Sequence, residues 1–402
     1  MPTNETATVP DARASVGPAS PAAPNSFPFL DLKAQFETIR EEIIEAVTRV
    51  LEHQHFILGP EVDTFERQVA PLTGCQHAIG CASGSDALVL ALLALEIGSG
   101  DEVITTPFTF IASAGSIARL GAKPVFADID PFTFNVSAEA IESAITPRTR
   151  AIMPVHLFGL SAEIDKIREI GEAHKLPIIE DAAQAIGATH EGQPVGSLGS
   201  IGCFSFFPSK NLGGAGDGGL VTTNDSALAE RLRVLRVHGA RKKYEYERLG
   251  VNSRLDALQA AILVVKLRHL NEWTNGRRAN AERYRNLVKQ FGIESALRVP
   301  LEPASGKHVY NQFTVRVNSR DELCKHLKQN GIPTEIYYPK PLHLQQAFAY
   351  LGYRVGDFPV AEAASREVVS LPIYPELTSE QQRTVIAAIA EFIGVQRSQA
   401  HV

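Results

Sequence analysis

The sequence predicts an α/β protein with two domains and a mostly parallel sheet. Strand-like apolar runs alternate with amphipathic helical stretches between residues 77 and 237, which is typical of a parallel sheet covered by helices on both faces. The chain has 402 residues, more than one small core usually supports. We expect a large domain over residues 28–270 and a smaller α+β domain over residues 271–402.

The composition is ordinary for a soluble globular enzyme. Hydrophobic residues make up 44% of the chain and charged residues 21%, and the net charge of −6 provides no basic field for nucleic acid or an anionic membrane. No apolar run approaches the roughly 18 residues of a membrane span. The four cysteines form no Cys-x-x-Cys pair, so we expect free thiols in a reducing cytoplasm. Residues 1–27 are rich in Ala, Pro, Ser and Thr and predict a disordered tail rather than a signal peptide.

Hydrophobic spacing predicts the elements of the first half of the chain. Apolar residues recur at helical spacing over residues 31–52, a loop follows over 53–60, and a second helix is expected over 61–70. From there strands and helices alternate. The expected strands are 77–82, 101–106, 123–128, 151–156 and 176–179. The expected helices are 87–96, 137–145 and 162–174, with a further helix that follows residues 107–110 and ends at residue 120.

The second half continues this pattern and then changes. We expect strands over 201–204 and 220–223, a helix over 226–237 and a polar loop over 238–244. A long helix beginning near residue 251 is expected to run from the large domain into the small one. The small domain is predicted to contain a strand over 311–317 and helices over 320–330 and 377–393.

Lys210 stands in a turn between two strand-like runs, with a glycine-rich stretch directly after it. A lysine in isolation is usually a solvated surface residue. Here the placement favours an amine that is held still and partly desolvated. Desolvation lowers the pKa of an ammonium group, and a neutral amine can form an imine with an aldehyde cofactor.

Asp181 follows another strand-like run, at the position where open α/β sheets bind ligands. Taken alone, it could be a helix N-cap. Together with Lys210 it matches the needs of pyridoxal phosphate, which takes a lysine for its aldehyde and a carboxylate for its ring nitrogen.

A phosphate site is predicted at residues 83–86, where a strand, a glycine turn and a helix start follow one another. Gly84, Ser85 and Asp86 open this helix, and free backbone N–H groups at such an end bind anions. A simple Ser or Asp cap is the alternative, and the two are compatible. Phe110, after the next strand, could lie on the pyridine ring or belong to the core.

Other motifs carry less weight. Residues 334–343 place tyrosines and a histidine in a proline-rich turn that suggests a lid or pocket wall. The basic run 241–243 is either solvated or meets a nucleotide diphosphate. His53 and His55 lack the acids or thiols of a metal site in their neighbourhood, so no metal is expected.

The chain resembles the sugar-nucleotide aminotransferases of the DegT/StrS family, which are pyridoxal-phosphate enzymes of fold type I, like aspartate aminotransferase. The resemblance covers nearly the whole chain from Phe29. The pieces that carry it are residues 83–85, 108–110, 155–159, 180–184, 205–210, 252–256 and 371–375.

The resemblance implies roles for the matching residues. Lys210 would be the Schiff-base lysine, Asp181 would pair with the pyridinium, and Gln184 would lie near the cofactor's phenolic oxygen. Phe110 would stack on the ring. The phosphate would be held by Gly84, Ser85 and Ser205, and by Asn252 of a neighbouring subunit. The family pattern therefore implies a homodimer with shared active sites. A subgroup that removes a hydroxyl carries histidine at the position of Lys210, so the lysine favours transamination.

Within the family, the chain looks most like enzymes that aminate a 3-keto UDP-N-acetylglucosaminuronate. Arg254 would then pair with the uronate carboxylate. The sugar pocket would be lined by Gln54, Phe56, Ser209, Tyr337, Tyr338 and His343. Those enzymes tend to carry histidine where this chain has Tyr337 and threonine where it has Ser85.

The expected reaction is a ping-pong transamination from L-glutamate to a keto-sugar nucleotide, with Lys210 moving the proton. Two other interpretations stay open. One is an enzyme of the same fold acting on a 4-keto sugar or a cyclitol. The other is a regulator that keeps the fold without catalysis.

Overall fold

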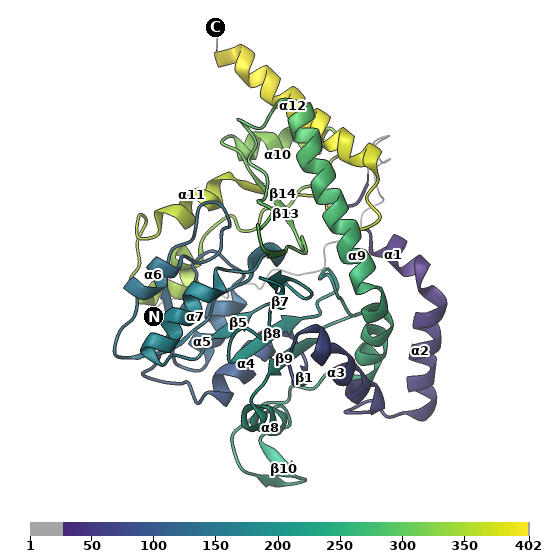
Figure 1. The fold of residues 1–402 in the computed structure, drawn as a ribbon, viewed down its shortest axis with the longest axis vertical. Helices are drawn as coiled ribbons and strands as arrows, with labels where there is room; N and C mark the ends of the chain where they lie inside the picture. The colour runs from purple at the N-terminus through teal and green to yellow at the C-terminus, as the bar shows by residue number, and fades with distance from the viewer. Residues whose placement is uncertain (1–26, 401–402) are drawn as a thin grey trace, which may run out of the picture.

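The computed structural model describes residues 27–400, with side chains described to residue 394 (Figure 1). The predicted disordered tail lies outside the described residues except for Phe27. This residue does not belong to a tail, because its side chain is only 8% exposed and packs with the C-terminal core.

A mostly parallel sheet forms the centre of the molecule, as predicted. Its strands lie in the order β3-β2-β4-β5-β8-β9-β1, with isolated parallel bridges joining the β4 and β5 sides. Only β9 runs antiparallel to its neighbours within this set. The bounds are β1 His77–Cys81, β2 Glu102–Thr105, β3 Lys123–Phe126, β4 Thr149–Ile152, β5 Ile179–Asp181, β8 Ile201–Ser205 and β9 Gly219–Thr223.

Helices cover both faces of this sheet (Figure 1). Successive strand residues point to opposite faces, so Ile179 packs in one cluster with α4, α5 and α8, and Ile178 packs in another with α3, α6 and α7. Both faces are therefore apolar and buried, which explains the continuous apolar runs. The bounds are α3 Pro60–Leu72, α4 Gly84–Ala94, α5 Ala112–Arg119, α6 Ala138–Ser143, α7 Ile164–His174 and α8 Ser226–Leu235.

The helix α9, Ala257–Gln290, connects the two parts of the fold. Its first half packs on α2 (Arg40–His53) and α3, and its second half joins the C-terminal core (Figure 1). Because α9 runs through residue 270, the division of domains at that position stays a prediction. The C-terminal core is built on α10 Arg320–Gln329, α12 Ser379–Ala400 and the antiparallel pair β13 Phe313–Arg316 and β14 Val368–Leu371.

Three local predictions were wrong. The long helix expected from near residue 251 begins at Ala257, because Asn252 pairs with Val237 in an extended segment and Asp256 is the N-cap. The helix expected over 31–52 is divided into α1 Leu32–Thr38 and α2 Arg40–His53, because Ile39 leaves helical geometry and buries its side chain. The loop expected over 238–244 contains a hairpin of β10 Ala240–Lys242 and β11 Glu245–Tyr246. The smaller elements are β6 Thr189–His190, β7 Gln193–Pro194, β12 Gly306–Lys307, η1 Leu157–Gly159, η2 Leu342–Leu344, η3 Gln346–Leu351 and α11 Pro359–Glu367.

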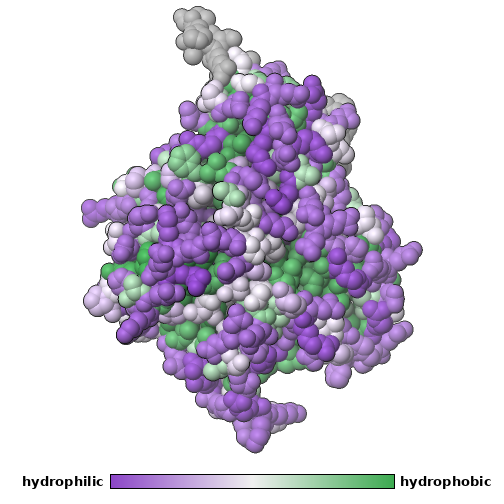
Figure 2. Space-filling view, viewed as in Figure 1, coloured by the Kyte–Doolittle hydropathy of each residue, from purple (hydrophilic) through white to green (hydrophobic). Residues whose placement is uncertain are grey.

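The surface is largely hydrophilic on the face shown in Figure 2, with hydrophobic patches across its middle. Within the described part of the chain, none of the helices combines the length and the apolar character that crossing a membrane would require.

Candidate active site

Asp181 and Lys210 reach the same edge of the sheet from neighbouring strands. The strands β5 and β8 are parallel, and Asp181, the last residue of β5, pairs with Cys203 on β8. β8 ends at Ser205, and Lys210 follows in a turn closed by its N–H and the carbonyl of Phe207 at 2.9 Å. The carboxyl edge of a parallel sheet is where this class of fold binds ligands.

The Asp181 carboxylate is buried and held by two hydrogen bonds. Oδ2 accepts from the Ser113 hydroxyl at 2.7 Å, and Oδ1 accepts from the Ala183 N–H at 3.2 Å. Burial raises the pKa of Asp181, while these two hydrogen bonds and the charge of Lys210 lower it. The carboxylate therefore keeps acceptor capacity for one further donor at this edge.

Lys210 is half-buried, and its pKa differs strongly from that of a surface lysine. Desolvation lowers the pKa to about 8, and the negative charge of Asp181 opposes this shift. Among the described residues, its Nζ has no hydrogen-bond or ion-pair partner. A much larger fraction of this amine than of a surface lysine is therefore neutral near physiological pH, in line with the prediction of an imine-forming lysine.

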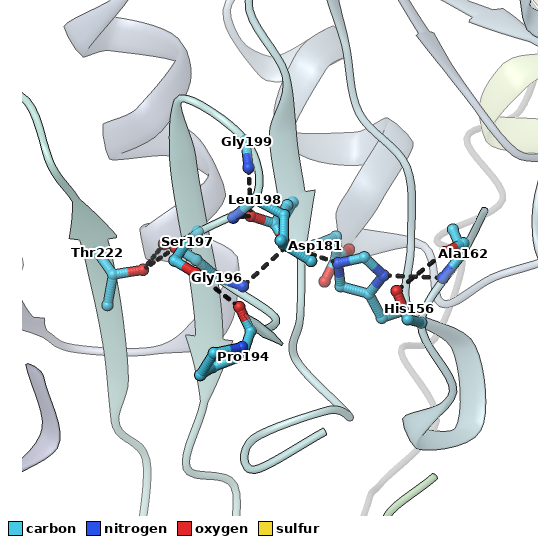
Figure 3. A network of polar contacts seen from close by, with 12 residues as sticks. His156, Ala162, Asp181, Pro194, Gly196, Ser197, Leu198, Gly199 and Thr222 are labelled. Atoms are coloured by element: carbon cyan, nitrogen blue, oxygen red, sulfur yellow. Dashed lines mark hydrogen bonds and ion pairs between the residues drawn. The ribbon is translucent and has the colours of Figure 1, made fainter. Parts of the chain in front are cut away.

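A buried network on the other face of the sheet fixes the end of β5 (Figure 3). The Ala162 N–H donates to Nδ1 of His156, so Nε2 carries the proton and donates to Glu180 Oε2 at 2.9 Å. The carboxylate of Glu180 also accepts backbone N–H groups at 2.6–2.8 Å. These belong to Gly196, Leu198 and Gly199.

Gln184 and Tyr338 meet above this edge, although they are far apart in the sequence. The Nε2 of Gln184 donates to the Tyr338 hydroxyl at 3.2 Å, and its Oε1 accepts from the Phe158 N–H at 2.7 Å. The ring of Tyr337 stands edge-on to that of Tyr338. The predicted residues Gln184, Tyr337 and Tyr338 therefore lie together.

The N-terminus of α4 lies directly against the end of β8. A Cβ at Gly84 would come within 2.5 Å of the Ser205 Cβ, so only glycine permits this approach. Ser83 is the N-cap, accepting from the Asp86 N–H at 3.1 Å, and Asp86 stands in the first turn. Gly84, Ser85 and Ser205 are thus placed as one cradle with free N–H groups.

Two predicted contacts, Asn252 and Arg254, line an open pocket of about 520 Å³ beside this cradle. Their loop is tied to it because the Ser253 hydroxyl accepts from the Ala82 N–H at 3.1 Å. The Arg254 guanidinium has no ion-pair partner among the described residues. The segment with Gln54 and Phe56 adjoins this loop, because the Phe56 carbonyl accepts from the Ala257 N–H at 2.9 Å.

The remaining predicted residues differ in exposure. Phe110 is 57% exposed and Ser209 is also exposed, so a ligand can reach both side chains. His343 is not brought together with the others. Its ring is buried, pairs with Glu362 at 3.1 Å and packs on Phe358. This burial does not favour a contact between His343 and the substrate, which stays a prediction.

Residues of the basic run and one of the two early histidines have acidic partners. Arg241 pairs with Glu230 and Glu247. His53 pairs with Glu61 at 2.9 Å, an acid that the sequence analysis did not connect with it.

Several residues of the site were missed. Ser113 could have been found from the sequence. It lies on the buried face of a helix that follows the end of a strand, and a buried hydroxyl needs a hydrogen-bond partner. Asn211 directly follows Lys210, donates to the Val309 carbonyl and accepts from Asn311, both at 2.8 Å. These bonds hold the lysine turn against a distant segment, and no local pattern indicated them.

The architecture matches that of a solved aminotransferase from Brucella abortus, with a TM-score of 0.87 and 40% identity, over 91% of this chain and 99% of that one. The structure of DesV from S. venezuelae has a TM-score of 0.88 and 45% identity, over 91% of this chain and 98% of that one. The fold and the site thus define the chain as an aminotransferase.

The chain belongs to the DegT/DnrJ/EryC1/StrS aminotransferase family, whose model matches residues 37–390. It is 51% identical to a "pleiotropic regulatory protein" of Geobacillus stearothermophilus, over 91% of this chain and 98% of the relative. It is 49% identical to a UDP-N-acetyl-3-dehydro-alpha-D-glucosamine 3-aminotransferase of Acidithiobacillus ferrooxidans, over 92% and 97%. The predicted family and enzyme class are confirmed.

Proposed function

We propose that this chain uses pyridoxal phosphate to move an amino group from L-glutamate to C3 of a 3-keto sugar nucleotide. One observation carries the proposal. Lys210, whose amine has a lowered pKa, and Asp181, whose carboxylate is buried, lie at the ends of adjacent strands.

The residues fit this cofactor. Gly84 lies so close to Ser205 that a side chain at position 84 would clash with it, and the first N–H groups of α4 at this place are donors suited to a phosphate. Asp181 retains an acceptor for a ring N–H, and exposed Phe110 offers a flat surface. When bound, pyridoxal phosphate supplies the carbonyl that takes up the amine and the ring that stabilises negative charge.

The chain's own residues then perform the proton transfers. Lys210 Nζ removes and returns the proton on the carbon that carries the amino group, and its lowered pKa suits both directions. Asp181 keeps the heterocycle's nitrogen protonated. The hydrogen bond between Gln184 and Tyr338 fixes the orientation of both side chains above the sheet edge.

The choice of C3 rests on the names of several relatives. Besides the 3-aminotransferase above, relatives 44–46% identical are named for 3-amino or 3-oxo sugars carried on dTDP or UDP. The unpaired Arg254 at the pocket mouth favours an acidic sugar, such as the 3-keto uronate of the UDP-2-acetamido-2-deoxy-3-oxo-D-glucuronate aminotransferase of Pseudomonas aeruginosa.

We also infer a cytoplasmic homodimer with shared sites. Asn252 is exposed beside the cradle, and Phe56, Ile57 and Leu58 next to it are 38–45% exposed apolar residues. A second copy covering this surface would bury them and bring Asn252 to its phosphate.

A half-reaction with a substrate panel tests the function. Glutamate should abolish the visible band of the bound cofactor and release 2-oxoglutarate, and 3-keto sugar nucleotides should then restore the band. Lys210→Ala should lose both steps, whereas Lys242→Ala, an exposed lysine of the hairpin, should retain them. Near-native turnover by Lys210→Ala would refute the assignment.

A regulatory protein without catalysis is the second candidate, favoured by the name of the 51% identical relative. It predicts a band that glutamate leaves unchanged. A response only to 4-keto sugars or cyclitols would replace the substrate class but keep the reaction.

A further inference from the structure

The Asp181 carboxylate has a hydroxyl partner that belongs to none of the predicted cofactor contacts. Ser113, in the first turn of α5, places its Oγ 2.7 Å from Asp181 Oδ2. The side chain is 1% exposed and Asp181 is 4% exposed, so water does not compete for this bond. A hydrogen bond between buried groups, one of them charged, is among the strong ones.

A second hydroxyl lies next to that of Ser113 and extends this hydrogen bond. Thr109 Oγ1 lies 3.3 Å from Ser113 Oγ and is also buried. An ionised carboxylate only accepts, so the single proton of Ser113 goes to Asp181. The Thr109 hydroxyl must then donate to Ser113. The three side chains form a chain of donors that ends on Asp181.

We propose that Ser113, supported by Thr109, is a positioning residue that holds Asp181 in one rotamer and in its ionised form for the cofactor's ring nitrogen. This inference rests on the proposed function, because it assumes that pyridoxal phosphate occupies the site. Ser113 acts through Asp181 and touches neither substrate nor cofactor.

The electrostatic surroundings explain why such a donor is needed. Burial is the largest influence on the pKa of Asp181 and raises it, and the Ser113 hydrogen bond is the largest influence that lowers it. The backbone N–H of Ala183 also lowers it. Among the described residues, the titratable groups that interact with this carboxylate are Lys210 after β8, His156 after β4, Cys203 on β8 and Tyr338 from the C-terminal part. Without Ser113, protonation of Asp181 would begin at higher pH, and a protonated acid no longer stabilises a ring N–H.

The test compares the affinity of the apoprotein for pyridoxal phosphate between pH 5.5 and 9. Ser113→Ala should weaken binding roughly tenfold to a hundredfold near pH 7, as expected for a lost hydrogen bond to a charge. As the pH is lowered, the affinity of Ser113→Ala for pyridoxal phosphate should also begin to fall at a higher pH than that of the wild type. Ser113→Thr, which keeps the hydroxyl, should restore most of both properties, and Thr109→Val should give a smaller loss than Ser113→Ala.

Two comparisons separate positioning from a general structural effect. Thr223→Val removes a buried hydroxyl at the opposite end of β9, where it donates to the Ser200 carbonyl at 2.8 Å, and should leave affinity unchanged. In an Asp181→Asn background, Ser113→Ala should cause little further loss, because the group it acts on is gone. An equal loss in both backgrounds, or a Ser113→Ala variant with wild-type affinity and pH profile, would overturn the proposal.

Failure of the proposed function has a different signature. A wild-type protein that does not bind pyridoxal phosphate overturns both ideas before any variant is compared. A wild-type protein that binds the cofactor but does not respond to glutamate overturns the transamination alone, and the affinity comparison still decides the role of Ser113.

Discussion

Glu180 and His156 form a fully buried pair in which Nε2 of the ring donates to Oε2 of the carboxylate at 2.9 Å. Glu180 is the residue before Asp181 on β5, and the two carboxylates point to opposite faces of the sheet. One carboxylate therefore anchors the strand end on which the other is presented to the site.

Glu180→Gln is expected to lower both stability and cofactor affinity. A glutamine places an NH₂ group among donors that need acceptors, so at least one of the four hydrogen bonds is lost. The free energy of unfolding should fall by about 1.5–3 kcal/mol, the range for hydrogen bonds to a charged group. Urea denaturation and cofactor titration measure the two effects. Glu172→Gln, an exposed acid on α7, is the control and should change neither. An unchanged Glu180→Gln protein would show that the network has no anchoring role.

The reaction of the apoprotein with pyridoxal phosphate should depend on pH through Lys210. Only the neutral amine attacks an aldehyde, and the pKa of Lys210 is lowered from 10.5 to about 8. The rate of covalent capture should therefore rise from pH 6.5 and level off above about pH 8.5. Borohydride trapping followed by peptide mapping measures capture at Lys210 alone. A rate that still rises steeply at pH 10 would mean that the site does not desolvate this amine.

Gly84→Ala should damage the phosphate cradle specifically. The added methyl group would meet the Ser205 Cβ at 2.5 Å and its Cα at 3.1 Å, so α4 or β8 must shift. Overpacking of this kind costs about 1–3 kcal/mol, which corresponds to a cofactor affinity roughly 5–150-fold weaker if the strain falls on the cradle. Gly115→Ala on α5 is the matched control, because its methyl group would meet nothing closer than 3.8 Å. Wild-type affinity in Gly84→Ala would argue against a phosphate at this end of α4.

Local sequence patterns predicted the functional residues at strand ends, but they did not predict contacts between segments that are distant in the sequence. Lys210 and Asp181 follow apolar runs, and the alternation of strands and helices then places them at one edge. The bond between Gln184 and Tyr338 joins residues 154 positions apart, and no local pattern indicates such a contact. His343 was predicted to line the pocket because polar aromatic residues surround it in sequence. Its pairing with Glu362 on α11 buries the ring, and no local pattern indicates this pairing, so the contact with substrate stays a prediction.

Acid should destabilise the fold partly through His308. The ring is 2% exposed, stacks on Tyr310 at 3.8 Å, and accepts the Tyr310 N–H at Nδ1. Desolvation lowers its pKa from 6.5 to about 3, so between these values the unfolded chain binds a proton that the folded chain does not. Stability therefore falls as the pH drops below 6.5, and at pH 5 the loss from this residue is about 2 kcal/mol. Urea denaturation at pH 7.5 and pH 5 should show a smaller difference for His308→Gln than for the wild type. The exposed His174 provides the control, since His174→Gln should keep the wild-type difference. If His308→Gln loses as much stability on acidification as the wild type, this ring does not carry the linkage.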